Sequence, residues 1–378
     1  MPRKLLIVAG ETSGELYGSL LAKALNDFKL FGIGGKKMFQ AGVELVGEIT
    51  HSFGIIEILT HLTKLRKNMN SAIALLKEID GVVLIDFPDF NLTLAEKAKR
   101  IGKKVIYYVA PQIWAWRYGR IKKIKKYIDF VASVLPFEED IYKKEDIPVK
   151  FVGHPITELL KEELGLDFDK FRIRKSLGIE SKTVITFMPG SRPSEIKKIL
   201  PFMFRILQSL RNSNIHFIIP LAPNIEFDEI TLKKFIFYEN LTILKERSFT
   251  ALAASDLAVI TSGTSTLQAA LLKIPMIVVY KLNPISYAIG RLFVKGVRHI
   301  SLPNIIADFM NLDSTVRVLE FIQSFNEKEV LNEIERLIHD KDYRQKIINF
   351  LEKIGSYFIH RQPSQEVAEL CRKIFFTA

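Results

Sequence analysis

Short apolar runs alternate with amphipathic stretches of helical length along most of this chain. Runs of this kind, bounded by turn residues, are typical of buried strands. The expected strands are Leu5–Ala9, Lys29–Ile33, Val82–Ile85, Val105–Val109, Phe130–Leu135, Val149–Val152, Val184–Met188, Ile215–Ile219, Leu241–Leu244, Leu257–Ile260 and Met276–Tyr280. Because strands that alternate with helices form β–α–β units, the pattern predicts an α/β fold with parallel sheets.

The chain has 378 residues, which is long for a single hydrophobic core, so two domains are expected. The alternation pauses in a charged stretch between about Pro155 and Lys182, and we place the domain boundary there. We expect two Rossmann-like, doubly wound domains that face each other across a cleft, followed by a charged helical tail from about Asp313. The expected ranges are 1–155 and 156–355 for the two domains and 356–378 for a C-terminal helix.

The composition limits the classes of partner. Lys and Arg number 54 against 42 Asp and Glu, a net charge of +12. This favours nucleic acid, an anionic membrane or phosphorylated substrates, unless the lysines are simply solvated. Zinc-finger spacing, an RRM signature and an arginine-rich arm are missing, which argues against nucleic acid. The single cysteine, Cys371, excludes an internal disulfide framework. No apolar run reaches the ~18–20 residues of a spanning helix, so we expect a cytoplasmic or peripheral membrane protein.

Two polar segments follow neighbouring apolar runs in the first half of the chain. Asp86-Phe87-Pro88-Asp89-Phe90-Asn91 comes after one run, and Pro111 through Arg117, which contains both tryptophans, comes after the next. Open α/β sheets bind ligands at the carboxyl ends of their strands. A carboxylate, an aromatic wall and a guanidinium at that edge suit a sugar, a phosphate or both. Asp89 is the candidate general base. Asp86 competes for this role or braces the loop, and the pair makes only a weak metal site.

Two glycine-containing turns in the second half resemble phosphate-binding turns. Pro189-Gly190-Ser191-Arg192 and Thr261-Ser262-Gly263-Thr264-Ser265-Thr266 each join an expected strand to a helix. Backbone N–H groups at helix starts bind anions, and Arg192 adds a guanidinium fork. The pair therefore predicts a diphosphate site, with Gln268 near a ribose hydroxyl; two simple helix caps are the alternative. Gly10 through Gly14 follows the first strand and is either a ligand-binding or a tight turn, without the GxGxxG or Walker A spacing.

An apolar stripe with helical spacing is formed by Ile55, Ile56, Ile58, Leu59, Leu62 and Leu65. Such a stripe is either the core face of a helix or a patch that receives acyl chains or enters a bilayer. Lys64, Arg66 and Lys67 at its end suit anionic head groups. Lys122, Lys123, Lys125 and Lys126 form a second basic cluster. We assign His154, in Gly153-His154-Pro155, a structural role.

Taken together, these segments resemble the lipid-A-disaccharide synthases, inverting glycosyltransferases of outer-membrane lipid A assembly. The segments that carry the resemblance occur in order: Ala9 to Gly14, Asp86 to Asn91, Pro111 to Arg117, Leu135 to Glu138, Phe151 to Pro155, Pro189 to Arg192, Ser262 to Thr264, and Ser301 to Asn304. The resemblance implies a GT-B fold. It also implies the reaction of UDP-2,3-diacylglucosamine with 2,3-diacylglucosamine 1-phosphate (lipid X), giving the β-1,6 disaccharide 1-phosphate and UDP. No metal or cofactor is implied, because helix N-termini and basic side chains stabilise the leaving diphosphate.

The resemblance also implies roles for individual residues. Asp89 matches the general base and Arg192 the essential arginine. The first domain would bind the acceptor lipid and the second the UDP-sugar. The expected nucleotide-sugar residues are Ser13, Gly14, Gly190, Ser191, Ser262, Gly263, Thr264, Thr266, Gln268 and Asn304. The expected acceptor and lipid residues are Trp116, Arg117, Ile55, Ile56, Ile58, Leu59 and Leu62. The enzyme would work on the inner face of the inner membrane, without nucleic acid. Its C-terminal helix would cross to the N-terminal domain of the same chain or of a partner in a swapped homodimer.

Three positions depart from the family pattern: Glu15 replaces a usual Asp, Gln268 a usual Glu, and Arg298-His299 is an unfamiliar variant. Whether Glu15, Glu57 or Asp86 assists Asp89 is open from the sequence. A UDP-sugar epimerase of GT-B fold and a non-catalytic lipid- or nucleotide-binding protein are the alternative functions.

Overall fold

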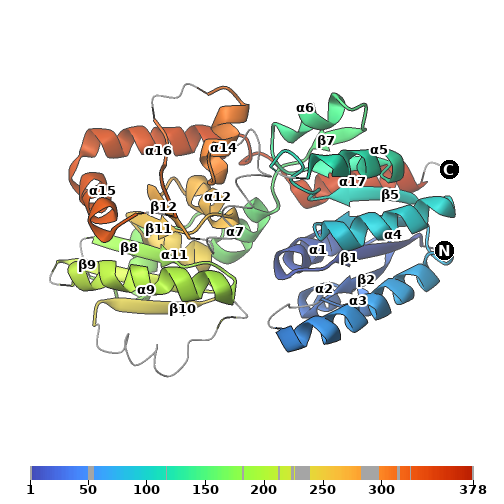
Figure 1. Ribbon diagram of the computed structural model, residues 1–378, viewed down its shortest axis with the longest axis horizontal. Coiled ribbons are helices and arrows are strands. Elements are labelled where there is room, and N and C mark those ends of the chain that lie inside the picture. The colour runs from blue at the N-terminus through green and yellow to red at the C-terminus, as the bar shows by residue number, and fades with distance from the viewer. Residues whose placement is uncertain are drawn as a thin grey trace. The chain divides into compact units, whose positions relative to one another are not determined.

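The computed structural model of the chain describes residues 2–49, 55–115, 117–180, 183–211, 213–222, 225, 239–281, 298–312, 316–323 and 325–376, without the side chains of 55–61 and 194. The chain divides into two compact units. We call them unit 1 (Met1–Glu158 with Arg361–Ala378) and unit 2 (Leu159–His360). Each unit is built on one sheet in which every described strand pair is parallel (Figure 1), so the predicted α/β class with parallel sheets is confirmed.

Unit 1 contains a seven-stranded sheet in the order β3-β2-β1-β4-β5-β6-β7. Its strands are β1 (Lys4–Ala9), β2 (Lys29–Gly34), β3 (Glu44–Glu48), β4 (Gly81–Ile85), β5 (Lys104–Tyr108), β6 (Phe130–Ser133) and β7 (Val149–Phe151). Its helices are α1 (Thr12–Ala24), α2 (Lys36–Gln40), α3 (Ile55–Leu75), α4 (Pro88–Arg100), the 3-10 turn η1 (Tyr118–Arg120), α5 (Ile121–Tyr127), α6 (Glu138–Lys143), the start of α7 (Ile156–Leu164), and α17 (Pro363–Phe376). The strand order reverses between β1 and β4, where Ala9 pairs with Ile85. Ligands of open sheets bind at such a switch point.

Unit 2 contains a six-stranded sheet in the order β10-β9-β8-β11-β12-β13. Its strands are β8 (Thr183–Met188), β9 (Ile215–Leu221), β10 (Leu241–Lys245), β11 (Leu257–Ile260), β12 (Met276–Tyr280) and β13 (Leu319–Ile322). Its helices include α8 (Lys170–Ser176), α9 (Pro193–Ser209), α11 (Ser248–Ala254), α12 (Thr264–Leu271), α14 (Leu302–Phe309), α15 (Glu327–His339) and α16 (Lys341–Ser356). This is the strand order of dinucleotide-binding Rossmann folds, and its switch point lies between β8 and β11, where Met188 pairs with Ile260.

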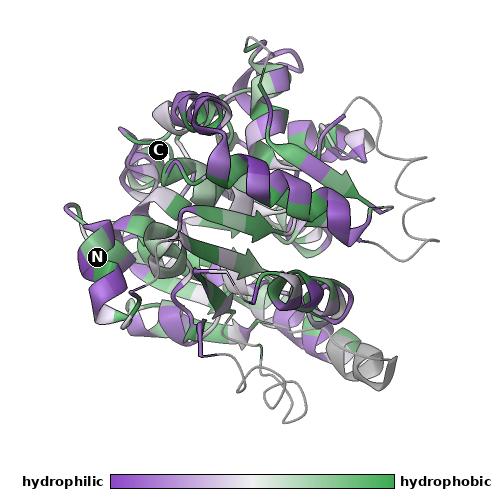
Figure 2. Ribbon diagram, turned by 90° about the vertical axis from the view of Figure 1, so that its left-hand side faces the viewer, coloured by the Kyte–Doolittle hydropathy of each residue, from purple (hydrophilic) through white to green (hydrophobic). Residues whose placement is uncertain are grey.

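The inner strands of both sheets are almost entirely buried. All residues of β4, β9 and β11 are buried, and Figure 2 shows the strands as mostly hydrophobic between helices of mixed hydropathy. In unit 1 the core extends from the sheet to α3, α4 and α5, through residues such as Ala72, Leu94 and Ile124. Strands covered on both faces read as continuous apolar runs, which is why the sequence pattern identified them.

Two strands were not predicted, β3 and β13. Both lie at a sheet edge, and their sequences, Glu44-Leu45-Val46-Gly47-Glu48 and Leu319-Glu320-Phe321-Ile322, contain charged residues and no long apolar run. The tail after Asp313 is therefore not wholly helical, because β13 pairs with β12 along Ile277 to Tyr280. Edge strands gain their hydrogen bonds from a single neighbour, so backbone pairing rather than apolar content defines them.

The last helix, α17, packs on unit 1 of its own chain. The Phe375 ring lies 2.2 Å from where a Cβ of Gly81 would stand, so this glycine allows the helix to approach the start of β4. Arg372 donates to both carboxylate oxygens of Asp27, at 2.8 and 2.9 Å. At the entry to the helix, Arg361 donates to the Phe151 carbonyl at 3.2 Å. These contacts at both ends attach the C-terminal segment to the sheet.

Candidate active site

The turn after β4 has an unusual backbone conformation. Asp86 and Phe87 both have φ near 48°, in the left-handed region that residues other than glycine seldom adopt. The Asp86 carbonyl accepts hydrogen bonds from the Asn91 amide at 2.7 Å and from the Tyr107 hydroxyl at 2.8 Å. The surrounding structure thus enforces a strained turn, and strain of this kind is concentrated at functional sites. The turn ends at Pro88, so Asp89 lies in the first turn of α4.

The turn after β1 is filled by an aromatic ring. A Cβ on Gly10 would lie 2.2 Å from the ring of Phe87, so Gly10 makes room for this ring. Phe87 also stacks on Phe90 with ring centroids 5.3 Å apart. Ser13 is exposed and Gly14 is buried on α1. These contacts give Gly10 a packing role, and nucleotide binding by Ser13 and Gly14 stays a prediction.

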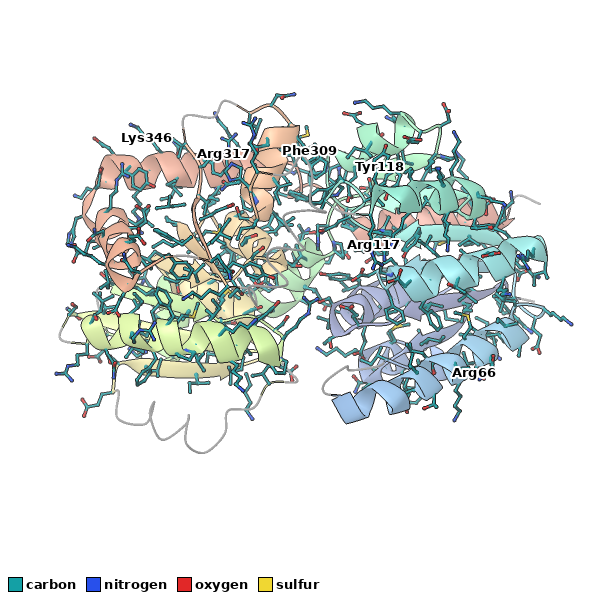
Figure 3. The ribbon with its side chains drawn as sticks, viewed as in Figure 1. Arg66, Arg117, Tyr118, Phe309, Arg317 and Lys346 are labelled. Atoms are coloured by element: carbon teal, nitrogen blue, oxygen red, sulfur yellow. The ribbon has the colours of Figure 1, made fainter. Side chains whose placement is uncertain are left out.

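Asp89 and Arg117 meet at the rim of unit 1. The Asp89 side chain is 77% exposed, and Arg117 Nη1 lies 3.4 Å from both of its carboxylate oxygens. Figure 3 labels Arg117. A second guanidinium, that of Arg120, donates from Nη2 to Asp89 Oδ1 at 2.6 Å. The sequence reasoning did not find Arg120, because it lies just beyond the tryptophan-containing segment that carried the resemblance.

Trp114 is a buried support rather than an exposed aromatic wall, which corrects the expectation from sequence. Its indole Nε1 donates to Glu138 Oε1 at 3.0 Å, and its ring meets Phe137 edge-on at 5.1 Å. Glu138 Oε2 accepts from the backbone N–H groups of Val134 and Leu135 at 3.2 and 3.1 Å. Burial raises the pKa of Glu138 to about 7 although these hydrogen bonds oppose the shift. Trp116 lies outside the described residues.

The three carboxylates considered as helpers of Asp89 differ in position. Glu15 is buried and accepts from the backbone N–H of Lys37 at 2.7 Å, so it caps the start of α2. Asp86 is near enough to Tyr17 to raise the pKa of that phenol, in addition to the larger effect of burial. The side chain of Glu57 lies outside the described residues. The Glu15 contact supports a structural role for this departure from the family pattern.

His154 begins α7. It is buried, its Nδ1 accepts from the Ile156 N–H at 3.2 Å, and the Tyr17 ring meets it edge-on. Burial lowers the pKa of His154 to about 3, so it is neutral at physiological pH. This geometry supports the structural role that we assigned to it.

In unit 2, the two predicted phosphate-binding turns lie side by side at the switch point. Gly190 has φ +113°, which favours glycine, and α9 begins three residues later at Pro193. The backbone N–H and the hydroxyl of Thr261, in the other turn, both donate to the Met188 carbonyl, at 3.0 and 3.2 Å. Ser191 is exposed, and Arg192, whose side chain is 65% exposed, contacts Glu195 at 3.4 Å. The turn therefore presents a guanidinium and a helix N-terminus together.

The second turn leaves open space at Gly263. This residue has φ +137°, and no atom lies within 4 Å of where its Cβ would stand. The N-terminus of α12, formed by Gly263 and Thr264, is therefore exposed on one side. Ser262 Oγ donates to the Ile300 carbonyl at 2.7 Å, and Gln268 Nε2 donates to Ser248 Oγ at 3.2 Å.

Two residues predicted to bind the nucleotide sugar are buried supports. Thr266 Oγ1 donates to the Gly263 carbonyl and accepts from the Leu302 N–H. Asn304 is fully buried; its Nδ2 donates to Val318 O and Glu320 Oε1, both at 2.8 Å, and its Oδ1 accepts from the Val318 N–H. With both ends of its amide engaged, Asn304 holds β13 in this structure. These contacts give Asn304 a structural role, and nucleotide-sugar binding by it stays a prediction.

Glu320, on the unpredicted strand β13, organises the segment before α14. Its carboxylate accepts from the N–H groups of Ile300 and Ser301 at 2.9 and 3.0 Å and from the Ser301 hydroxyl at 2.6 Å. His299 Nδ1 lies 3.4 Å from the same carboxylate. The unfamiliar His299 thus brings a ring nitrogen to a buried acid. An isolated Glu in an unpredicted strand offered no sequence signal.

The apolar stripe on α3 is partly buried and partly exposed. Leu65 packs against the core of unit 1, whereas Leu62 is 56% exposed. Arg66, labelled in Figure 3, and Lys67 are exposed, and Lys64 pairs with Glu48 at 3.0 Å. The side chains of Ile55, Ile56, Ile58 and Leu59 lie outside the described residues.

No helix among the described residues has both the length and the apolar content that crossing a bilayer requires. Nor do the described side chains include a group of three or more His, Cys, Asp or Glu arranged to hold a metal ion.

Comparison with known proteins places the chain. A lipid-A-disaccharide synthase of Coxiella burnetii is 36% identical over 386 residues, which cover 99% of each protein, and one of Trichlorobacter lovleyi is 35% identical over 374 residues and 94% of each. A putative UDP-N-acetylglucosamine 2-epimerase from Listeria monocytogenes superposes with a TM-score of 0.65 at 13% identity, covering 100% of this chain and 97% of that one. The latter likeness concerns the fold alone and confirms the predicted GT-B class. A family model described as lipid-A-disaccharide synthetase matches residues 5–367, and the chain therefore belongs to this family of glycosyltransferases.

Proposed function

We propose that the chain transfers diacylglucosamine from UDP-2,3-diacylglucosamine to lipid X, with inversion, giving the β-1,6 disaccharide 1-phosphate and UDP. Family membership over the whole chain supports this activity. The observation that carries the mechanism is Asp89, an exposed carboxylate on the first turn of α4, held by two arginines at the carboxyl edge of the sheet. A base that deprotonates a sugar hydroxyl must be accessible and fixed in this way.

The donor binds to unit 2 in this proposal. The diphosphate lies against the N-termini of α9 and α12, which follow the turns Gly190-Ser191-Arg192 and Ser262-Gly263-Thr264. The side chain of Arg192 supplies a positive charge. Helix N-termini and guanidinium groups stabilise the negative charge that develops on the leaving UDP. Gln268 approaches the ribose.

The acceptor binds to unit 1. Asp89 takes the proton from the six-hydroxyl of lipid X, the hydroxyl oxygen forms a bond to the anomeric carbon, and the bond from that carbon to the diphosphate oxygen breaks. The electron pair of the broken bond leaves with UDP. Because the attack comes from the face opposite the leaving group, a single displacement inverts the anomeric centre. Arg117 pairs with the 1-phosphate of lipid X.

Both substrates carry acyl chains, so the enzyme would work at a lipid surface. Leu62 is exposed beside Arg66 and Lys67 on α3, which suits shallow insertion of an apolar side chain beneath anionic head groups. We place the protein on the cytoplasmic face of the inner membrane. A homodimer in which α17 leaves unit 1 of its own chain and packs on that of a partner belongs to the same proposal.

The test is product analysis by mass spectrometry after incubation with UDP-diacylglucosamine and lipid X in detergent and EDTA. A disaccharide 1-phosphate with stoichiometric UDP is expected. A new UDP-sugar isomer without disaccharide would indicate an epimerase, and no product with or without magnesium would indicate a binding protein.

Asp89→Asn tests the base directly. We expect turnover to fall by about 100-fold or more, as removal of a general base does, with UDP affinity unchanged. Near-normal turnover would remove Asp89 from the mechanism. Glu96→Gln, on the same helix and within the Arg100–Glu96 pair, is the matched control.

A further inference from the structure

The two arginines at Asp89 hold it unequally. Arg120 Nη2 donates to Oδ1 at 2.6 Å, a short charge-assisted hydrogen bond. Arg117 Nη1 lies 3.4 Å from each oxygen, and among the described residues it is the contact at Oδ2. The Arg120 side chain is 11% exposed and that of Arg117 is 52% exposed. Arg120 thus fixes Oδ1 through a short hydrogen bond, whereas Oδ2 has the long, solvent-exposed contact with Arg117.

The backbone around these arginines explains the difference. Arg120 ends the turn η1, its N–H donates to the Arg117 carbonyl at 2.9 Å, and the buried Ile121 that follows anchors α5 in the core. Arg117 has φ 54° and precedes this turn, next to the exposed Tyr118 that is labelled beside it in Figure 3. The guanidinium of Arg120 is therefore attached to the packed part of unit 1, and that of Arg117 extends from its rim.

Each carboxylate oxygen has two lone pairs, and a guanidinium 3.4 Å from both oxygens competes with an incoming hydroxyl for those of Oδ2. We propose that Arg120 is a positioning residue that holds Asp89 through Oδ1, and that the acceptor's phosphate draws Arg117 away from Oδ2, freeing this oxygen to take the hydroxyl proton. The inference rests on the proposed transferase function and adds a substrate-controlled activation of its base. The proton passes from the hydroxyl to Oδ2, and the rest of the displacement proceeds as described above.

The energetics favour this exchange. A phosphate monoester carries about −1.5 to −2 charges at neutral pH, more than a carboxylate, and it matches the guanidinium fork. The Arg117–Asp89 contact that must be released is long and exposed to solvent, and ion pairs of this kind contribute little. The shorter contact from the nearly buried Arg120 survives, so Asp89 stays in place as Arg117 moves.

The test compares lipid X with its counterpart lacking the 1-phosphate, measuring kcat and KM from UDP release. For the wild-type protein we expect a fall of about tenfold or more in kcat, beyond any rise in KM, when the phosphate is absent. In Arg117→Ala, KM for lipid X rises and the two acceptors give the same kcat. In Arg120→Ala, kcat for lipid X falls by about 100-fold with little change in KM, because a misplaced base loses its attack geometry. Arg120→Lys restores part of that loss.

Arg100→Ala removes a matched arginine–carboxylate contact of 2.6 Å from the far end of the same helix and should leave both constants unchanged. UDP affinity and the thermal melting curve of each variant verify that it is folded. Equal kcat for both acceptors in the wild-type protein, or wild-type kcat in Arg120→Ala, would overturn the inference while disaccharide formation still upheld the transferase. Absence of disaccharide from the wild-type protein with either acceptor would overturn the proposed function itself.

Discussion

Glu138 should make the stability of unit 1 depend on pH in an unusual direction. Its carboxylate is buried beneath the tryptophan-containing loop and accepts hydrogen bonds from Trp114, Val134 and Leu135. Burial raises its pKa from 4.5 to about 7 in the folded protein. Each pKa unit is worth ~1.4 kcal/mol, so the difference in proton affinity between the folded and unfolded states corresponds to ~3 kcal/mol.

The sign follows from which state binds the proton. Below about pH 4.5 Glu138 is protonated in both states, and its contribution is fully present. Between pH 4.5 and 7 the folded protein keeps the proton that the unfolded chain has released, so the free energy of unfolding falls as the pH rises. Above pH 7 both states are ionised and the contribution is lost. The Glu138→Gln variant has no titrating group at this position, so its free energy of unfolding lacks this decrease with rising pH.

The assay is urea unfolding at pH 5, 6, 7 and 8, followed by tryptophan fluorescence. Both tryptophans of the chain, Trp114 and Trp116, lie in unit 1, so the signal reports this unit alone. We expect the stability of the wild-type protein relative to Glu138→Gln to fall by ~2.5 kcal/mol from pH 5 to pH 8. Glu78→Gln, which changes an exposed carboxylate, should run parallel to the wild type. A constant difference between wild type and Glu138→Gln across this range would refute the reasoning.

Three further predictions concern the other sites. Arg192→Ala should weaken UDP binding by about tenfold or more in calorimetry, since a hydrogen bond to a charged group contributes ~1.5–3 kcal/mol; unchanged affinity would exclude its diphosphate role. Glu320→Ala should lower the free energy of unfolding of unit 2 by at least ~2 kcal/mol in urea titrations, because the N–H groups of Ile300 and Ser301 lose their acceptor, whereas Glu327→Ala, at a half-buried helix start, should cost less. Leu62→Glu should reduce co-sedimentation with anionic vesicles several-fold relative to Thr63→Glu, and equal binding by the two variants would argue against insertion at this position.

The sequence was sufficient for the features that depend on local pattern. Buried parallel strands read as apolar runs because helices cover both of their faces, and polar residues directly after a strand must emerge at its carboxyl edge. For that reason Asp89 and Arg117, far apart in the chain, could be assigned to one rim before the structure was known, and the structure brings their side chains together. The Gly190 and Gly263 turns followed from the same rule.

The tertiary structure decided what depends on pairing between distant segments. The edge strand β13 is defined by its ladder with β12, and Glu320 acquires its role only because that ladder carries it beneath Ser301. Asn304 matched a family motif, yet packing buried it as a support. Arg120 meets Asp89 across 31 positions of sequence, and Trp114 meets Glu138 across 24. Sequence patterns record periodicity and order along the chain. Burial and hydrogen-bond partners depend instead on which surfaces the folded sheet and helices bring into contact. Only the tertiary structure contains that information.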